Sequence, residues 1–416
     1  MRSGPPEAPG TLGHLRMDVR ADRFPLVDSL RAIAALAIVG FHAGLFAGVA
    51  DSTSLASRIA SNLQVGVPIF FLISGFLLYR PFTRARLEGT GPPRTGAYAW
   101  RRFLRIVPAY WVALTLAAIV GVAGAFTLSR VPVYYGFAQI YSSDTYAGGL
   151  SPAWTLCVEV SFYALLPLWA LAMRALPKPG GRGVWLRQEL VALAALFAFS
   201  VAYKSIVALS VDVNAFSSQP LLMALPNFCD QFAVGMAIAV LSVYGEGRDR
   251  PVGLVRAIDA RSWLPWAVAA VAFAVACAGI GLTGRIGDPL TRTSFMLRHE
   301  LWTLVALGVV LPAMLGDFGR GFPRRVLAWR PLAFAGLVSY GVFLYHVPWI
   351  QLLVRWDFDS SWGGWLLVAG AGAIALGTAS YYLVERPALS LKRLVPARRM
   401  DAAGEALAEP APLTPR

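Results

Sequence analysis

Apolar runs long enough to cross a lipid bilayer recur along this chain, separated by short polar loops. The hydrocarbon core of a bilayer is about 30 Å thick, so a spanning helix needs roughly 20 apolar residues. The segments of about that length are 26–48, 65–81, 106–126, 153–173, 188–210, 220–243, 263–283, 298–316, 331–353 and 363–384. The pattern therefore predicts an all-α fold, a polytopic bundle of about ten transmembrane helices.

Basic residues fall in alternate loops between these runs. Cytoplasmic loops of membrane proteins collect Lys and Arg. With the N-terminus inside, most of the 37 Lys and Arg residues lie in segments that the prediction places on the inner side. A missing or extra helix would destroy this alternation, so the charge pattern predicts that both termini are cytoplasmic.

Composition and net charge agree with a membrane protein. Hydrophobic residues make up 57% of the chain and charged residues 14%, which is too apolar for a soluble domain to cover with polar surface. The net charge of +14 follows from this topology and from attraction to anionic lipid. We therefore expect a lipid bilayer around the chain and no nucleic-acid partner.

The predicted helices leave short segments at the two ends. Residues 1–23, which include His14, lack an apolar run, so we expect a disordered cytoplasmic leader. Residues 24–387 form the predicted membrane domain, and residues 388–416 a short cytoplasmic tail. Three cysteines lie inside predicted helices, where packing is a better interpretation than a metal or disulfide role; they are Cys157, Cys229 and Cys277.

The first predicted helix contains two ionisable residues, Arg31 and His42. Such residues are costly in a membrane and need an explanation. At about 100° and 1.5 Å per residue, 11 positions place the two side chains on one face, about 16 Å apart along the axis. Both are expected to face one cavity, with Arg31 in the inner part and His42 in the outer half. Ordinary hydrogen bonds between helices are the alternative.

Other predicted helices place polar groups at a depth similar to that of His42. Glu159 enters from the outer side, and His346 lies far along a helix that runs outward. These residues could converge with His42. His299 and Glu300, at the outer edge of another helix, could join them, although the membrane interface is the expected position of that pair.

Two arginines mark the opposite, cytoplasmic side of the predicted bundle. Arg102 and Arg105 are three residues apart and share a helical face. Guanidinium groups suit a phosphate-bearing ligand, although anchoring at the inner membrane surface is the alternative.

Several strings in the chain together resemble one family, the membrane-bound acyltransferase-3 family of bacterial O-acetylases and acylases. They are FPLVDSLRAIAALAIVGFHAG at 24–44, GVPIFFLISGFLL at 66–78, RRFLRIVPAYW at 101–111, SPAWTLCVEVSFYALLPL at 151–168, VSYGVFLYHVPW at 338–349 and VERP at 384–387. Their order and topology match the family over nearly the whole membrane unit. Ser29 stands where the family usually has glycine, a substitution of one small residue for another.

The resemblance implies an O-acyltransferase that draws its acyl group from a cytoplasmic thioester, commonly acetyl-CoA. Arg102 and Arg105 would hold the donor's phosphates, and the pantetheine arm would run past Arg31 toward His42. A neutral imidazole suits general base catalysis near pH 7, so His42 is the expected base, with Glu159 or His346 orienting it or the substrate. We expect acyl-CoA as a co-substrate, with no bound cofactor or metal.

The sequence leaves the path of the acyl group and the acceptor open. His42 could activate the acceptor directly, or it could carry the acyl group as an acyl-imidazole. The family's acceptors imply a hydroxyl on a glycan, a glycolipid or a macrolide-type antibiotic. Arginine greatly outnumbers lysine in this chain, which is typical of GC-rich bacterial genomes, and we expect a multi-pass protein of the bacterial inner membrane.

A ten-helix transporter or flippase is the competing interpretation, because charges inside helices also mark permeation pathways. Lys204 and Asp230 are the residues that this interpretation would emphasise, although they could equally form a structural pair or line the acceptor cavity. Acceptor-dependent release of free CoA distinguishes the enzyme from a transporter.

Overall fold

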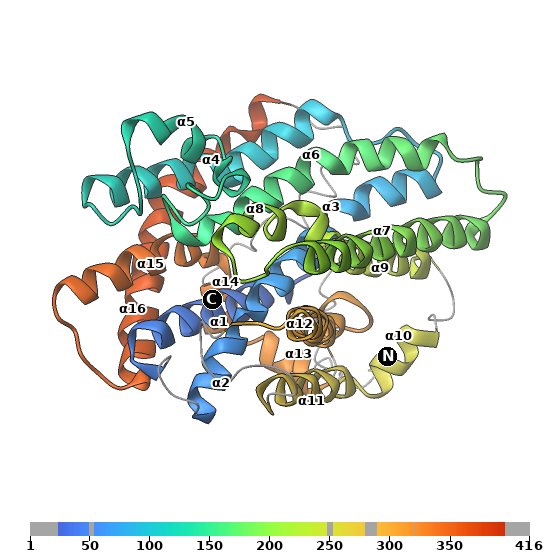
Figure 1. The fold of residues 1–416 in the computed structure, drawn as a ribbon. Coiled ribbons are helices and arrows are strands. Elements are labelled where there is room, and N and C mark those ends of the chain that lie inside the picture. Colours follow the sequence, from blue (N-terminus) through green and yellow to red (C-terminus); the bar gives the residue numbers. More distant parts are fainter. Residues whose placement is uncertain (1–23, 50–53, 248–252, 279–288, 320, 396–416) are drawn as a thin grey trace, which may run out of the picture.

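The computed structural model describes residues 24–49, 54–247, 253–278, 289–319 and 321–395, and these residues fold almost entirely into helices (Figure 1). The long helices are α1 (Val27–Phe46), α3 (Gly66–Leu87), α4 (Thr95–Ile119), α6 (Trp154–Ala175), α7 (Arg182–Ser210), α9 (Cys229–Gly245), α11 (Leu264–Ala278), α12 (Arg292–Met314), α15 (Ser339–Arg355) and α16 (Trp362–Ser380). Within those ranges the β-pairing is an isolated bridge between Gly124 and Gly149. The predicted all-α fold is confirmed.

Shorter helices connect these segments or extend them. They are α2 (Leu55–Asn62), α5 (Val131–Tyr135), α8 (Gln219–Leu222), α10 (Gly253–Ala260), α13 (Phe322–Leu327), α14 (Arg330–Leu337) and α17 (Arg386–Ser390). A π-helical segment, Tyr381–Glu385, joins α16 to α17.

Eight helices among the described residues are long and apolar enough to cross a membrane, and the number rises to ten if each of two bent pairs is one span. Every predicted span corresponds to one of these helices or pairs. The expected leader at 1–23 lies outside the described residues.

The predicted span at 331–353 is not a straight helix. It divides into α14 and α15, which are bent by 71°. Helix α14 packs closely on α1. The approach is possible because Gly336 has no side chain: the Asp28 carbonyl oxygen occupies the space that a Cβ there would need. The hydrophobic pattern detects the apolar run but not this tertiary contact. A second bend of 81° separates α10 from α11.

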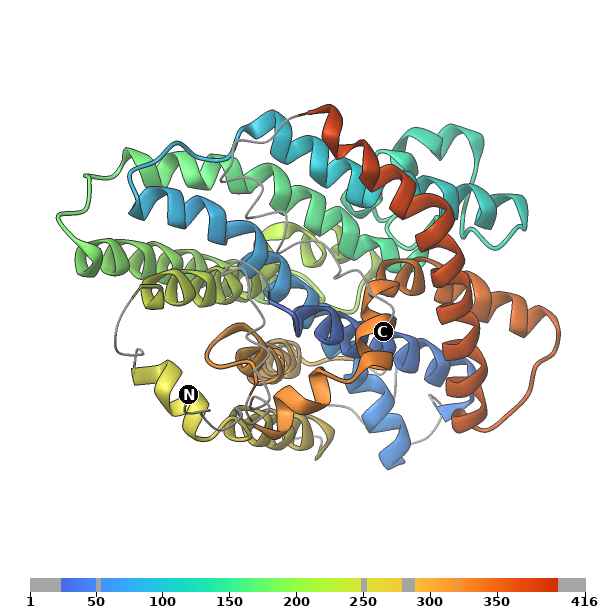
Figure 2. The ribbon, with the colours of Figure 1, turned by 180° about the vertical axis from the view of Figure 1, so that it is seen from behind.

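Helix α3 lies inside the bundle and contacts α1, α6, α9 and α12 (Figures 1 and 2). Its closest approach is to α9, where glycines on both helices remove the side chains from the contact. Gly75 faces the Phe232 carbonyl and Gly235 faces the Leu72 carbonyl, at separations that leave no room for a Cβ. This packing fixes α3, which contributes to both cavities described below.

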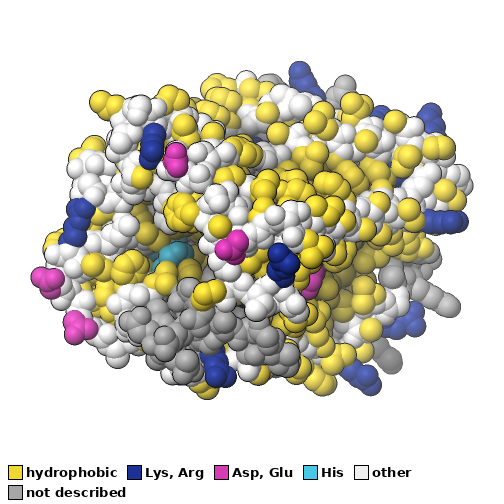
Figure 3. All heavy atoms as spheres, viewed as in Figure 1, with side chains coloured by type: hydrophobic (Ala, Val, Ile, Leu, Met, Phe, Trp, Pro, Cys, Tyr) yellow, Lys and Arg dark blue, Asp and Glu magenta, His cyan; other side chains and the backbone are white. Residues whose placement is uncertain are grey.

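Hydrophobic side chains cover much of the surface seen in Figure 3, and charged side chains are sparse there. Large apolar residues on the lipid-facing helices are well exposed, including Leu171 on α6, Ile206 on α7 and Leu367 on α16. A soluble protein rarely exposes such a continuous apolar surface. The exterior is that of a multi-pass membrane protein.

Candidate active site

A cavity of about 90 Å³ lies among α1, α3, α4, α6 and α15. We call it the inner pocket. Arg31, Arg102 and Arg105 line it together with Glu159 and Tyr163. All three residues predicted to bind the donor therefore share one cavity, although they come from two different helices.

The arginines of the inner pocket are held in different ways. Arg31 forms an ion pair with Asp28 one turn earlier, at 3.0 Å. Arg105 forms an ion pair with Glu385 at 3.5 Å and lies 5.8 Å from the centre of the Tyr340 ring. Within the described structure, the buried Nε of Arg102 has no hydrogen-bond partner. Arg102 thus offers a donor that an anionic ligand could satisfy.

Glu159 lies at the polar side of the inner pocket. Its carboxylate accepts hydrogen bonds from Ser74 Oγ at 3.3 Å and from Tyr163 OH at 2.6 Å, and it interacts electrostatically with Arg31 and Arg102. The structure therefore groups Glu159 with the arginines.

His42 and His346 meet in space, although 304 positions separate them in the chain. His42 Nδ1 lies 3.0 Å from the Ile38 carbonyl oxygen and 3.2 Å from His346 Nε2. His346 Nδ1 lies 2.7 Å from the Phe343 carbonyl oxygen. Both carbonyl-bearing residues, Ile38 and Phe343, also line the inner pocket. The histidine pair is therefore joined to the wall of that cavity by hydrogen bonds, although neither ring is among the residues that line it.

These contacts determine the tautomer of each ring. A carbonyl oxygen only accepts, so both Nδ1 atoms carry the hydrogen. His346 Nε2 then accepts from His42 Nδ1–H, and the lone pair of His42 remains on Nε2. His42 is half-buried and His346 is fully buried. The arrangement presents His42 Nε2 as a proton acceptor, with His346 behind it as the orienting group.

The structure separates polar groups that the sequence placed at a similar depth. His42 pairs with His346, and Glu159 joins the inner pocket. His299 and Glu300, both on α12, belong to another cluster, which also includes residues of α7 and α9. Sequence reasoning did not single out Tyr163 or Glu385. The spacing of four residues between Glu159 and Tyr163 was the available signal for the first, whereas the contact of Glu385 with Arg105 depends on the fold.

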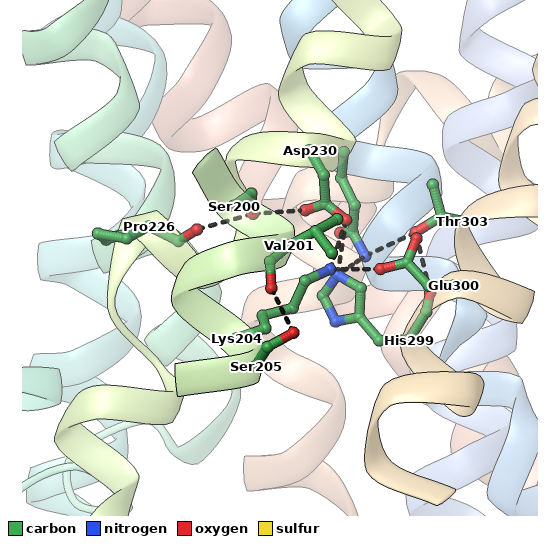
Figure 4. A network of polar contacts seen from close by, with 10 residues as sticks. Ser200, Val201, Lys204, Ser205, Pro226, Asp230, His299, Glu300 and Thr303 are labelled. Carbon is green, nitrogen blue, oxygen red and sulfur yellow. Dashed lines mark hydrogen bonds and ion pairs between the residues drawn. The ribbon is translucent and has the colours of Figure 1, made fainter. Parts of the chain in front are cut away.

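The other cluster is centred on Lys204 (Figure 4). Its ammonium lies 2.6 Å from Asp230 Oδ2 and 2.6 Å from Glu300 Oε1. Ser200 Oγ donates to Asp230 Oδ1 at 3.0 Å, and His299 Nε2 lies 3.2 Å from Asp230 Oδ2. Asp230, His299 and Glu300 have ligand atoms close enough together for a metal ion, but the Lys204 ammonium already forms ion pairs with both carboxylates. Of the alternatives that the sequence left open for Lys204 and Asp230, the structure shows the pair.

An all-helical membrane unit with a histidine pair hydrogen-bonded to residues of an arginine-lined cavity fits a membrane-embedded acyltransferase, and comparison with known families agrees. A family model described as an acyltransferase domain, acyltransferase family 3, matches residues 25–384. The chain belongs to the acyltransferase-3 family and is an O-acyltransferase.

Similar proteins include the peptidoglycan O-acetyltransferase OatA of Listeria monocytogenes, which is 22% identical over 87% of this chain and 55% of its own length. The exopolysaccharide production protein ExoZ of Rhizobium meliloti is 25% identical, over 81% of this chain and 92% of its own. The acyltransferase MdmB of Streptomyces mycarofaciens is 28% identical over 39% of this chain and 43% of its own. No solved structure matches the chain.

Proposed function

We propose that this enzyme transfers an acyl group, in particular acetyl, from a cytoplasmic acyl-CoA to a hydroxyl of a sugar-containing acceptor, with His42 as the general base. The observation that carries the proposal is the hydrogen bonding of the histidine pair, which leaves the lone pair of His42 on Nε2 and joins both rings to carbonyl groups of residues that line the inner pocket.

The inner pocket supports an anionic donor. Arg31, Arg102 and Arg105 come together there, and Arg102 Nε is buried and unpartnered in the described structure. Guanidinium groups bind phosphate strongly, and acyl-CoA carries phosphates at the end remote from its thioester. A long pantetheine arm can connect the arginines with the histidine pair. Positioning the thioester in this way lowers the entropic cost of the reaction.

The proposed chemical step is a direct acyl transfer. His42 Nε2 takes the proton of the acceptor hydroxyl while the hydroxyl oxygen attacks the thioester carbonyl carbon. The tetrahedral intermediate then expels the CoA thiolate, which takes the proton back from His42. The products are the ester and CoA thiol. His346 Nε2 accepts from His42 Nδ1–H throughout, and this hydrogen bond stabilises the imidazolium that forms after proton uptake.

The names of the relatives support a sugar hydroxyl as the acceptor. OatA is named for O-acetylation of peptidoglycan and ExoZ for exopolysaccharide production. MdmB is also named an acyltransferase. Within the proposed class, glycans, glycolipids and glycosylated antibiotics share the same reacting hydroxyl group.

The test is thiol release from acetyl-CoA by the purified, detergent-solubilised protein, with and without a panel of glycosidic acceptors. We expect acceptor-dependent release. His42→Ala should lower kcat by about 10²- to 10⁴-fold, the usual contribution of general base catalysis, without lowering acyl-CoA affinity. Full activity of His42→Ala would exclude the proposed base. If folded wild-type protein releases no thiol with any acyl-CoA, substrate-flux assays for a transporter become the next measurement. Trapping an acyl group on His42 would favour the acyl-imidazole relay over direct transfer.

The donor site has a separate test. Arg102→Ala combined with Arg105→Ala should raise the KM for acyl-CoA by at least about tenfold, because hydrogen bonds to charged groups contribute about 1.5–3 kcal/mol each. Arg94→Ala is the control, since Arg94 is exposed at the start of the same helix and does not line the inner pocket. An unchanged acyl-CoA dependence in the double variant would make these arginines membrane anchors only.

A further inference from the structure

A second cavity, of about 210 Å³, lies among the first turns of α3, α6 and α9 and the first half of α12. We call it the outer pocket, because the predicted topology places these helix ends outside. A single water needs about 10–15 Å³ of such space. The outer pocket can therefore hold a ligand much larger than water.

Aromatic rings form part of the wall of the outer pocket. Trp154, Phe228 and Trp302 line it, and the rings of Trp154 and Phe228 lie 5.5 Å apart. Ligand pockets commonly combine such apolar and aromatic surfaces with a few polar groups. The C–H face of a pyranose ring is a suitable partner for an aromatic side chain.

Two buried amides contribute unpartnered polar atoms to the same wall. Asn227 and Gln231 are each 2% exposed and line the pocket. Among the residues that the structure describes, neither Asn227 Oδ1 nor Gln231 Oε1 has a hydrogen-bond partner. A buried polar atom left in this way is costly. Ligand hydroxyls both donate and accept, so a polyhydroxylated ligand would satisfy both positions.

Arg298 is the one Lys or Arg among the described residues that line the outer pocket, and its neighbour His299 is the one other titratable side chain there. Its guanidinium lies 4.8 Å from the centre of the Trp302 ring. A positive charge at this wall favours a neutral or anionic ligand and opposes a cationic one.

Gln231 and His299, which line the outer pocket, connect its wall with the Lys204 cluster shown in Figure 4. Gln231 Nε2 lies 3.0 Å from His299 Nε2 and 3.2 Å from Thr303 Oγ1. His299 in turn contacts Asp230, which pairs with Lys204. These contacts connect α7, α9 and α12. They hold the Gln231 side chain in place, so its unpartnered Oε1 has a fixed position at the pocket.

The outer pocket adjoins the inner pocket. Val67 lines both cavities. Phe71 of the inner pocket also contacts Phe228 of the outer pocket, with ring centres 5.4 Å apart. Side chains that line the two cavities are therefore in direct contact with one another.

We infer that the outer pocket is the acceptor site and that it selects a neutral or anionic polyhydroxylated ring over a protonated amino sugar. The inference rests on the proposed function, because it assigns the acceptor of that reaction. The aromatic wall and the unpartnered amides define the hydroxyl-rich ring, and Arg298 defines the charge preference.

Binding can be measured without catalysis. Saturation-transfer NMR on the detergent-solubilised full chain would compare methyl β-D-glucopyranoside, the corresponding methyl glucuronide and the 2-amino analogue at about pH 6, where its amine is protonated. The neutral glycoside and the glucuronide should bind, and the amino sugar should bind at least about tenfold more weakly than the neutral glycoside. Arg298→Gln should remove most of that difference. Unchanged discrimination in Arg298→Gln, or equal binding of all three glycosides to the wild type, would overturn the inference.

A matched pair of variants tests the location of the site. Met223 lines the outer pocket, whereas the side chain of Leu221, two positions earlier, is 45% exposed and does not line it. Met223→Trp should fill the cavity and weaken binding of the neutral glycoside by at least about tenfold, while Leu221→Trp should bind like the wild type. Equal binding by the two variants would place the glycoside elsewhere. If Met223→Trp does not fold, the Arg298→Gln comparison decides the question.

The two proposals can fail separately. In one outcome, thiol release depends on His42, but Met223→Trp and Arg298→Gln leave the acceptor KM unchanged. This result would retain the proposed function and reject the outer pocket as acceptor site. In the other outcome, Met223→Trp and Arg298→Gln change glycoside binding, but the protein releases no thiol. This result would retain the sugar site and reject the acyltransferase mechanism proposed for it.

Discussion

At the scale of single residues, the main feature is the division of work between two histidines. His42 Nδ1–H donates to both the Ile38 carbonyl and His346 Nε2, so its tautomer is set by its own helix as well as by its partner. His346 is a positioning residue, because it acts through His42. Removing His346 should therefore cost less activity than removing His42.

His346→Leu should lower kcat by about 10- to 100-fold with little change in the KM for acyl-CoA. The physical reason is the loss of one hydrogen bond to the imidazolium of His42, since bonds to charged groups contribute about 1.5–3 kcal/mol. His346→Gln keeps a hydrogen-bond acceptor near His42 Nδ1, so its kcat should be higher than that of His346→Leu. Steady-state thiol release by both variants is the measurement. Equal losses in His346→Leu and His346→Gln would indicate that His346 only fills space.

At the scale of elements, α3 is held against α9 by glycines on both helices. The backbone of each helix occupies the space that a side chain on the other would need. Because α3 lines the inner and the outer pockets, this contact holds in place a helix that both pockets share.

Gly235→Ala should destabilise the protein, because the new Cβ would collide with the Leu72 carbonyl oxygen. Overpacking of this kind costs about 1–3 kcal/mol. Gly370→Ala on α16 is the matched control: its new Cβ meets nothing within 4 Å, so replacing a helical glycine there should be neutral or slightly stabilising. Thermal unfolding in detergent would compare the two. A Tm for Gly235→Ala equal to that of Gly370→Ala would show that the helix pair can separate without cost.

At the scale of the whole molecule, buried charge joins helices that are distant in the sequence. Lys204 on α7 forms ion pairs with Asp230 on α9 and Glu300 on α12, and the side chains of Lys204 and Asp230 are fully buried. A buried ion of this kind is stabilised by its partners, so removing one partner leaves an uncompensated charge.

Lys204→Met should therefore lower the free energy of unfolding by about 3–5 kcal/mol. The control is Lys178→Met, because Lys178 is exposed in the loop between α6 and α7 and its replacement should change stability by about 0.5 kcal/mol or less. Unfolding followed by intrinsic fluorescence measures both. If Lys204→Met were as stable as Lys178→Met, the cluster would not hold α7, α9 and α12 together.

The sequence by itself determined the class of the protein. Apolar runs of bilayer length specify helices because a backbone in lipid must satisfy its own hydrogen bonds, and the alternation of basic loops follows from topology. The motifs around Arg31, His42, Arg102, Arg105, Glu159 and His346 also carried the family resemblance. These properties are local, since each depends on residues that are near one another in the chain.

Only the tertiary structure decided which of these groups meet. His42 and His346 touch, Glu159 joins the arginines, and Lys204 pairs with Asp230 and Glu300. Helical periodicity gives the face and approximate depth of a side chain, but helix rotation, tilt and the α14–α15 bend depend on packing between helices. The outer pocket is the clearest case, because its wall combines residues of four long helices and no local pattern marks it.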